Sequence, residues 1–371
     1  MKKTFLKHEH FQQLLDALKE AGFACIGPQV RDGAIIYDTL TTSTQLPWGL
    51  RDFQEPGSYR LEKTAEYKAF SWANGPQALK PYLFKAEETL WRVKRDEAGK
   101  FIFEAEYAKA PAIAFIGARA CDLAALAIQD KVFIEAKQID IRYQQRRESL
   151  LIIAVNCTYA SKNCFCVSAG TGPKVNHAYD LVLTEVDQGF VVQSGSERGA
   201  AILAKLTLTP ASLLQIQQGA LEIQQAANMQ SKKIPFNNTR ALGLALMNKL
   251  DHPRWLDVAE RCLSCGNCTL VCPTCFCHSE RDKPSLEATS SEHVREWDSC
   301  FTKGHSYITG KVIRPDTQSR YRQWLTHKVA TWFEQFDVSG CVGCGRCITW
   351  CPVGIDLTEE LSAMVEDFHE T

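Results

Sequence analysis

Two short cysteine runs of identical spacing constrain this chain more than any other feature of its sequence. Each run has three cysteines at intervals of three residues, a fourth cysteine four residues further on, and a proline directly after it. Three thiols placed so close together in sequence lie on one tight coil. The runs are Cys262, Cys265, Cys268 and Cys272, followed by Pro273, and Cys341, Cys344, Cys347 and Cys351, followed by Pro352.

This spacing is the one by which bacterial ferredoxins hold paired 4Fe-4S clusters. The first three cysteines of a run reach three irons of one cubane, and the fourth ligates the other cluster. We therefore expect one cluster on Cys262, Cys265, Cys268 and Cys351, and a second on Cys341, Cys344, Cys347 and Cys272. Two such clusters held side by side serve to pass single electrons onward.

Glycines inside the runs support this interpretation. Gly266, Gly343 and Gly345 tolerate positive φ and let backbone amides approach the sulfurs. Such amide–sulfur hydrogen bonds help to set the reduction potential. Structural zinc on Cys-x2-Cys pairs is the competing interpretation, but zinc does not require three evenly spaced cysteines and a Cys-Pro in both runs.

The rest of the composition indicates a protein of a reducing compartment. The chain has 371 residues, 16 cysteines and a formal net charge of −1, without a long charged run. Nucleic acid and anionic membranes are therefore not expected partners. The first residues lack the apolar centre of a signal peptide, and we find no uninterrupted apolar stretch of ~18 residues. We expect a cytoplasmic protein in which cysteine binds metal rather than forming disulfides.

Sequence patterns divide the chain into two parts. Residues 1–232 read as an α+β or α/β domain, with a helix over 10–22, alternating strands within 90–107 and 181–194, and buried strands at 111–118 and 150–156. A helix after the first buried strand suggests a parallel crossover. Residues 233–371 read as a mostly α-helical ferredoxin-like domain, with the linker at 230–238. The 68 residues from 273 to 340 that separate the runs are expected to add helical surface.

A third group of cysteines follows the two predicted buried strands. Cys121 comes after the first strand, and Cys157, Cys164 and Cys166 come after the second. The carboxyl ends of neighbouring parallel strands are where an open sheet forms its ligand site. These four thiols could hold a third 4Fe-4S cluster, zinc or no metal, and Asp122 or His177 could replace one thiol as a ligand.

Four cysteines remain after these assignments. Cys275 and Cys277 directly follow the first run, and the simplest interpretation makes them small buried residues that shield a cluster. Contact with a neighbouring redox centre and a ligand exchange within the first run stay open as alternatives. Cys25 and Cys300 are expected to be ordinary buried residues.

Several motifs of catalysis and nucleotide binding do not occur in the sequence. No G-x-G-x-x-G follows a strand, and there is no P-loop, no H-E-x-x-H and no C-x-x-C-H. No nucleophile and base stand out as a pair, so no catalytic residue is assigned. An electron relay within a larger enzyme fits this chain better than a self-contained catalyst does.

At this point the motifs together resemble a known family. "PGSYRLEK", "FIGARACDLAAL", "NCFCVSAGTGP", "CPTCFC", "WDSC", "IRPDTQSRYRQWLTHK" and "GCVGCGRCITWCPVGIDL" are similar to the iron–sulfur β subunit of soluble NAD(P)-linked NiFe hydrogenases, also called sulfhydrogenases. The same family includes the electron-input subunit of anaerobic sulfite reductase. The resemblance covers nearly the whole chain and strengthens the expectation of a site at Cys121, Cys157, Cys164 and Cys166.

The resemblance also implies partners. Such a subunit links a flavin subunit that handles NAD(P)H to a catalytic partner, which is the NiFe small and large subunits in a hydrogenase and a sirohaem subunit in a sulfite reductase. FAD, NAD(P) and NiFe are then expected on the partner chains only. We favour the hydrogenase branch on the "IRPDTQSRYRQ" and "VGCGRCITWCPVGIDL" segments. A structural or sensing iron–sulfur protein is a remote alternative from a different class.

Overall fold

The structure is a computed structural model that describes residues 3–105 and 110–366. Within these residues the larger sheet has eight strands, in the order β12-β1-β11-β10-β9-β8-β2-β3. Their bounds are β1 Thr4–Lys7, β2 Ala24–Arg31, β3 Ala34–Thr39, β8 Ile113–Ala118, β9 Leu151–Val155, β10 Leu181–Val186, β11 Gly189–Ser194 and β12 Thr209–Pro210. The sheet is mixed. Its four central strands, β10, β9, β8 and β2, pair in parallel with one another, and all pairs outside them are antiparallel.

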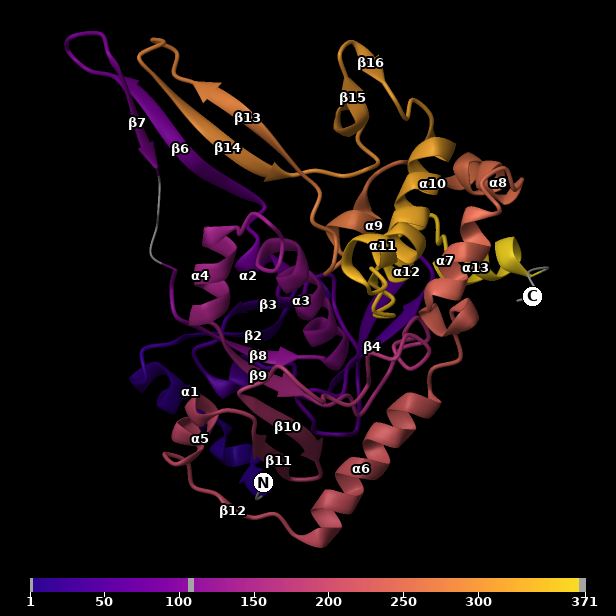
Figure 1. Ribbon diagram of the computed structural model, residues 1–371. Coiled ribbons are helices and arrows are strands. Elements are labelled where there is room, and N and C mark those ends of the chain that lie inside the picture. Colours follow the sequence, from indigo (N-terminus) through magenta and orange to yellow (C-terminus); the bar gives the residue numbers. More distant parts are fainter. Residues whose placement is uncertain (1–2, 106–109, 367–371) are drawn as a thin grey trace.

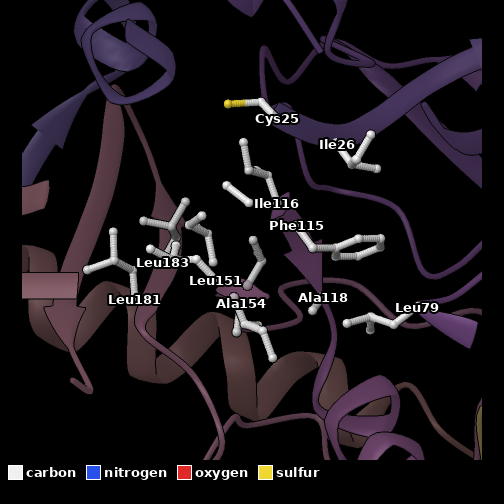
Figure 2. Packing of buried hydrophobic residues seen from close by; sticks show 14 of the residues in the cluster. Cys25, Ile26, Leu79, Phe115, Ile116, Ala118, Leu151, Ala154, Leu181 and Leu183 are labelled. Atoms are coloured by element: carbon white, nitrogen blue, oxygen red, sulfur yellow. The ribbon is translucent and has the colours of Figure 1, made fainter. Parts of the chain in front are cut away.

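The centre of this sheet is apolar on both faces, as the sequence predicts. Every residue of β9 is buried, and so is all of β8 after Ile113. Figure 2 shows Phe115, Ile116, Leu151 and Leu183 packed together at this centre. The predicted parallel crossover is confirmed: β8 and β9 pair in parallel, and helices α3 (Ala120–Phe133) and α4 (Ile141–Ser149) connect them.

Other local predictions in this part are also confirmed. Helix α1 spans Phe11–Glu20 and ends before Gly22, whose φ of 86° lets the chain turn away. Strands β10 and β11 form the expected hairpin. The alternating pattern at 90–107 gives a second hairpin of β6 (Glu87–Arg95) and β7 (Phe101–Ala105), while the last two residues of that range lie outside the described residues.

The prediction of a helical insertion between the cysteine runs is wrong for its first half. Residues 278–297 form an antiparallel hairpin of β13 (His278–Pro284) and β14 (Ser290–Trp297). This hairpin joins β6 and β7 in a four-stranded sheet of order β13-β14-β6-β7, which projects from the molecule as an arm (Figure 1). Both halves of the chain therefore contribute strands to one sheet. Because β14 gains its partner β6 from far along the sequence, local pattern gives little sign of it.

A buried ionic network fixes the base of the arm. Arg295 of β14 donates to Glu88 of β6 at 3.0 Å and also pairs with Asp140, which caps α4. Glu88 pairs in turn with Arg146. The arm is thus tied to the crossover helices of the large sheet and not only to its own strands.

The remainder of the chain is largely helical and surrounds the cysteine runs. Helix α6 (Leu213–Asn228) leads from the sheet towards it along one side of the molecule (Figure 1). Its helices are α7 Arg240–Met247, α8 Arg254–Arg261, α9 Asn267–Leu270, α10 Thr317–Thr326, α11 Trp332–Phe336, α12 Arg346–Thr349 and α13 Leu357–Val365, with a π-helical segment at His327–Thr331. The shorter elements are α2 Lys80–Leu83, α5 Glu197–Leu203, β4 Leu50–Glu55, β5 Ser58–Lys63, β15 Tyr307–Ile308 and β16 Lys311–Val312.

The predicted linker at 230–238 is packed rather than loose. Gln230 contacts the Cys166 thiol at 3.3 Å, and Lys232 pairs with Asp356. Asn238 is buried and donates its Nδ2 to the carbonyl oxygen of Cys341 at 2.8 Å. The segment therefore holds the second cysteine run against the sheet. None of the helices in residues 3–105 and 110–366 has the length and apolar character needed to cross a bilayer.

Candidate metal centres

Each cysteine run is a coil that ends in a one-turn helix. Gly266 precedes α9 and Gly345 precedes α12, both with a φ of 75°, a conformation that glycine adopts without the usual strain. Helices α9 and α12 contact each other, which brings the two runs side by side. The fourth cysteine of each run comes after this helix, and is therefore separated from the three cysteines of its own coil.

The first group of thiols lies around one cavity. Cys262, Cys265 and Cys268 line it together with Cys351 from the second run. Mostly apolar side chains complete the wall; they are Phe301, Tyr321, Trp324, Ile355 and Leu357. Backbone amides donate to two of the sulfurs, Ser264 N to Cys262 at 3.4 Å and Ile355 N to Cys351 at 3.3 Å.

The second group joins Cys272 to the second run. Burial raises the pKa of the Cys347 thiol well above its usual value, and the nearby Cys344, Cys341 and Cys272 thiols raise it further. Burial likewise raises the pKa of Cys341 to about 12. Lys328 lies beside this group, with its Nζ donating to the Cys272 Sγ at 3.3 Å.

The chemistry of both groups fits a cluster of positively charged irons. In the first group, burial raises the pKa of Cys268 well above its usual value, followed by the effect of Cys262, Cys351 and Cys265. A buried thiol among other thiols, such as Cys268, resists ionisation on its own, because thiolates repel one another and burial penalises charge. Iron compensates that charge, since the thiolate is the form that binds metal.

The structure also brings together the four cysteines that follow β8 and β9. Cys121 is in the first turn of α3, and Cys157, Cys164 and Cys166 lie in the loop after β9. Burial raises the pKa of Cys166 above its usual range, and Cys164, Cys157 and Cys344 add to the effect. Cys121 has Cys344 and Cys166 as neighbours. This third group therefore lies next to the second one.

The loop of the third group and the second run are in tight contact. A Cβ on Gly343 would lie 2.6 Å from the carbonyl oxygen of Phe165, and one on Gly345 would lie 2.2 Å from that of Asn163. Phe165 also donates its amide to the Gly343 carbonyl at 2.9 Å. These glycines are needed for close backbone packing between two thiol groups, in addition to their positive φ.

The alternative ligands of the third group are placed differently. The carboxylate of Asp122 accepts the Arg119 amide at 3.0 Å and forms an ion pair with Arg346, while His177 is exposed to solvent. Nowhere in the described part of the chain do three His, Cys, Asp or Glu side chains converge as a single metal ion requires. The ligands of a cubane lie farther apart than those of a single ion, because each binds a different iron.

The remaining cysteines differ in their surroundings. Cys25 lies in the core of the large sheet, as expected (Figure 2). Cys275, Cys277 and Cys300 are only half buried and line a second cavity. Sequence patterns did not single out the charged residues next to the thiols, which are Arg119, Lys328 and Arg346. The sequence offered a signal for two of them: Lys328 lies in a basic segment, and Arg346 lies within the "CGRC" of the second run.

Comparisons with known proteins agree with this geometry. Residues 261–355 match the family of 4Fe-4S dicluster domains, a range that contains both runs. Sulfhydrogenase 2 subunit beta of Pyrococcus furiosus is 27% identical over 323 residues, which cover 83% of this chain and 90% of that protein. No solved structure matches the chain. Residues 261–355 are thus a 4Fe-4S dicluster region, in an iron–sulfur electron-transfer protein distantly related to a sulfhydrogenase beta subunit.

Proposed function

We propose that this chain is the electron-transfer subunit of an NAD(P)-linked NiFe hydrogenase. It relays electrons between a flavin subunit that oxidises or reduces NAD(P)H and the NiFe small and large subunits. The distant relationship to a sulfhydrogenase beta subunit supports this branch of the family. The clusters supply one-electron carriers, and this chain's own residues bind them and keep water away.

One observation carries the proposal: the three thiol groups are neighbours in a row. Cys347 belongs to the second group and lines the cavity of the first. Cys344, also of the second group, is a neighbour of Cys121 and Cys166 in the third. Electron transfer falls steeply with distance, so adjacent carriers in series are what a relay requires.

We assign ligands accordingly. Cys262, Cys265, Cys268 and Cys351 hold one 4Fe-4S cluster, and Cys341, Cys344, Cys347 and Cys272 hold another. We propose that Cys121, Cys157, Cys164 and Cys166 hold a third. The third assignment rests on the proximity of Cys157, Cys164 and Cys166 to one another and of Cys121 to Cys166, at the ends of β8 and β9, where parallel strands form a ligand site.

The test is to isolate the chain anaerobically from its native host together with its partners. Stoichiometric nickel and a flavin should accompany it. Of the iron in the complex, about twelve atoms per copy should belong to this chain if it holds three cubanes. Sirohaem in place of nickel would move the protein to the sulfite reductase branch. A chain that purifies without partners, and whose clusters dithionite does not reduce, would overturn the relay role.

A matched pair of variants tests the relay itself. Cys265→Ser should lose the first cluster and the electron transfer from NAD(P)H that depends on it. Cys25→Ser removes a thiol of the sheet core that belongs to none of the three groups, and should keep both the first cluster and the electron transfer. Full NAD(P)H-linked electron transfer in the Cys265→Ser complex would contradict the proposal.

A further inference from the structure

A second cavity lies beside the cysteine runs and belongs to none of the three groups. It has a volume of about 510 Å³ and is partly open to solvent. Its walls come from the segment after the first run, the loop after β14, and the end of α10 with the following π-helical segment. Three thiols face it, those of Cys275, Cys277 and Cys300. A volume of this size suits a small molecule.

The register of the β13–β14 hairpin brings two of these thiols together. His278 of β13 is opposite Trp297 of β14, and Asp298 N donates to the carbonyl oxygen of Cys277 at 2.9 Å. Cys277 and Cys300 therefore sit at the end of the hairpin opposite its turn, and their side chains are hydrogen-bonded to each other. A thiol pair in mutual contact is the arrangement of a dithiol that can form a disulfide.

A histidine and a carboxylate support Cys277. His305 is hydrogen-bonded to the Cys277 thiol, and its Nδ1 lies 3.2 Å from the Oδ2 of Asp298. Hydrogen bonds from Cys300 and then from His305 lower the pKa of Cys277 to about 4. With the His305–Asp298 pair beside it and its thiol on the cavity wall, Cys277 is placed to act as the nucleophile of the pair, and the π-helical segment carries His327 on the opposite wall.

The cavity adjoins the second thiol group. Cys275 is hydrogen-bonded to Cys272, and the Nζ of Lys328 lies 3.3 Å from the Cys272 Sγ and 3.7 Å from the Cys275 Sγ. Cys275 and Lys328 both contact Cys272 and line the cavity, so an electron that reaches the second group is one side chain away from the cavity. This proximity gives the dithiol a source of reducing electrons.

The lining is basic. Arg314, Lys328 and three histidines face the cavity, and no Asp or Glu is among its lining residues within the described chain. The Nε of Arg314 is buried and has no hydrogen-bond partner in residues 3–105 and 110–366. An unsatisfied guanidinium nitrogen in a basic cavity calls for an anionic ligand.

We propose that Cys277 and Cys300 form a redox-active dithiol that reduces small anionic disulfides bound in this cavity. The thiolate of Cys277 attacks one sulfur of the disulfide R–S–S–R, forming a mixed disulfide and releasing RS⁻. The Cys300 thiol gives up its proton to solvent as its sulfur attacks the Cys277 sulfur, releases the second RS⁻ and leaves a Cys277–Cys300 disulfide. Two electrons, arriving singly from the second group, and one proton restore the Cys277 thiolate and the Cys300 thiol. The regeneration step rests on the proposed relay function; the exchange step does not.

The exchange step is tested on the full chain in its complex, reduced and kept anaerobic. Dithiodiglycolate is the anionic probe, and cystamine is a cationic disulfide of similar size. Peptide mass spectrometry should find a Cys277–Cys300 disulfide at least tenfold faster with dithiodiglycolate. Equal rates with both probes would overturn the anionic specificity, and no Cys277–Cys300 disulfide with either would overturn the dithiol.

Variants sharpen the test. Cys300→Ser should trap the probe as a stable mixed disulfide on Cys277, and Arg314→Gln should slow the anionic probe without slowing cystamine. Cys25→Ser is the control and should behave as the wild type does. Loss of iron from Cys277→Ser or Cys300→Ser, compared with that control, would show a metal site and overturn the proposal.

A second stage separates this proposal from the relay. NAD(P)H added to the complex should convert the Cys277–Cys300 disulfide back to thiols. If disulfide exchange occurs and NAD(P)H also reduces the clusters but never this disulfide, the link between cavity and second group is wrong. If NAD(P)H fails to reduce the clusters at all, the relay function fails and the exchange result still stands.

Discussion

Arg346 and Asp122 form an ion pair of 2.9 Å in which both side chains are inaccessible to solvent. Arg346 follows Cys344 in the second run, and Asp122 follows Cys121 in α3, so the pair links two of the thiol groups. Arg346 also donates to the carbonyl oxygens of Gly75 at 3.0 Å and Gln77 at 3.1 Å. These contacts anchor the second run to the sheet part of the chain.

Replacing Asp122 by Ala should destabilise the whole chain. The change leaves a buried guanidinium without its counter-charge, which typically costs about 3–5 kcal/mol. Asp337→Ala is the matched control, because its pair with Arg240 is exposed and such pairs contribute less than about 1 kcal/mol. Denaturant unfolding of both variants measures the difference, and equal losses of unfolding free energy would argue against a structural role for the buried pair.

Gly345→Ala should disrupt the contact between the second and third thiol groups. Its Cβ would lie 2.2 Å from the Asn163 carbonyl oxygen, on top of the strain of a φ of 75°. Gly99→Ala carries the same type of strain at a φ of 79° but meets no atom within 4 Å. Iron per chain should fall in the first variant and stay unchanged in the second. Iron loss in both would assign the effect to backbone strain alone.

Lys328→Met should lower the reduction potential of the cluster at Cys272. Burial alone would lower the pKa of Lys328, but the Cys272 and Cys275 thiols raise it well above its usual value, so the ammonium stays charged. A positive charge favours the more negative, reduced cluster. Its removal should shift the potential down by roughly 50–100 mV, since ~1.4 kcal/mol corresponds to 59 mV for one electron.

The control for this shift is Lys311→Met, at an exposed position of β16. Redox titration followed by electron paramagnetic resonance measures both variants. An unchanged or higher potential in Lys328→Met would show that the ammonium does not act on this cluster.

The reactivity of Cys277 should be nearly independent of pH between about 5.5 and 8. Its pKa is lowered to about 4, so the thiolate is already formed throughout this range. An ordinary thiol with a pKa near 8.5 gains thiolate about tenfold per pH unit below that value. Peptide-resolved alkylation rates distinguish the two behaviours. A rate for Cys277 that climbs tenfold per unit between pH 6 and 8 would show an unperturbed thiol.

Local chemistry explains which features the sequence could predict. The spacing of the runs implies that Cys272 and Cys351 leave their own coils, and the structure places each beside the other run's three cysteines. Continuous apolar character predicted β8 and β9 correctly. The crowding of the third group follows from where these strands end. In each case the information lies within a few residues of the feature.

Features that depend on distant partners could not be predicted in this way. The β13–β14 hairpin is stabilised by pairing with β6. The register between β13 and β14 puts Cys277 next to Cys300. The Arg346–Asp122 pair joins residues whose proximity only the finished fold creates. The interpretation of Cys277 as shielding considered burial but not the cavity, which needs the π-helical segment as its far wall.

The most direct test of the account is the spectrum of a single-cysteine variant. The crossed ligand sets predict that Cys351→Ala loses the same cluster as Cys262→Ala, although Cys351 is in the other run. Electron paramagnetic resonance of the dithionite-reduced chains should therefore give matching spectra for these two variants, distinct from that of Cys341→Ala. A Cys351→Ala spectrum that matches Cys341→Ala instead would show that each run holds its own cluster, and would contradict the arrangement on which the relay is built.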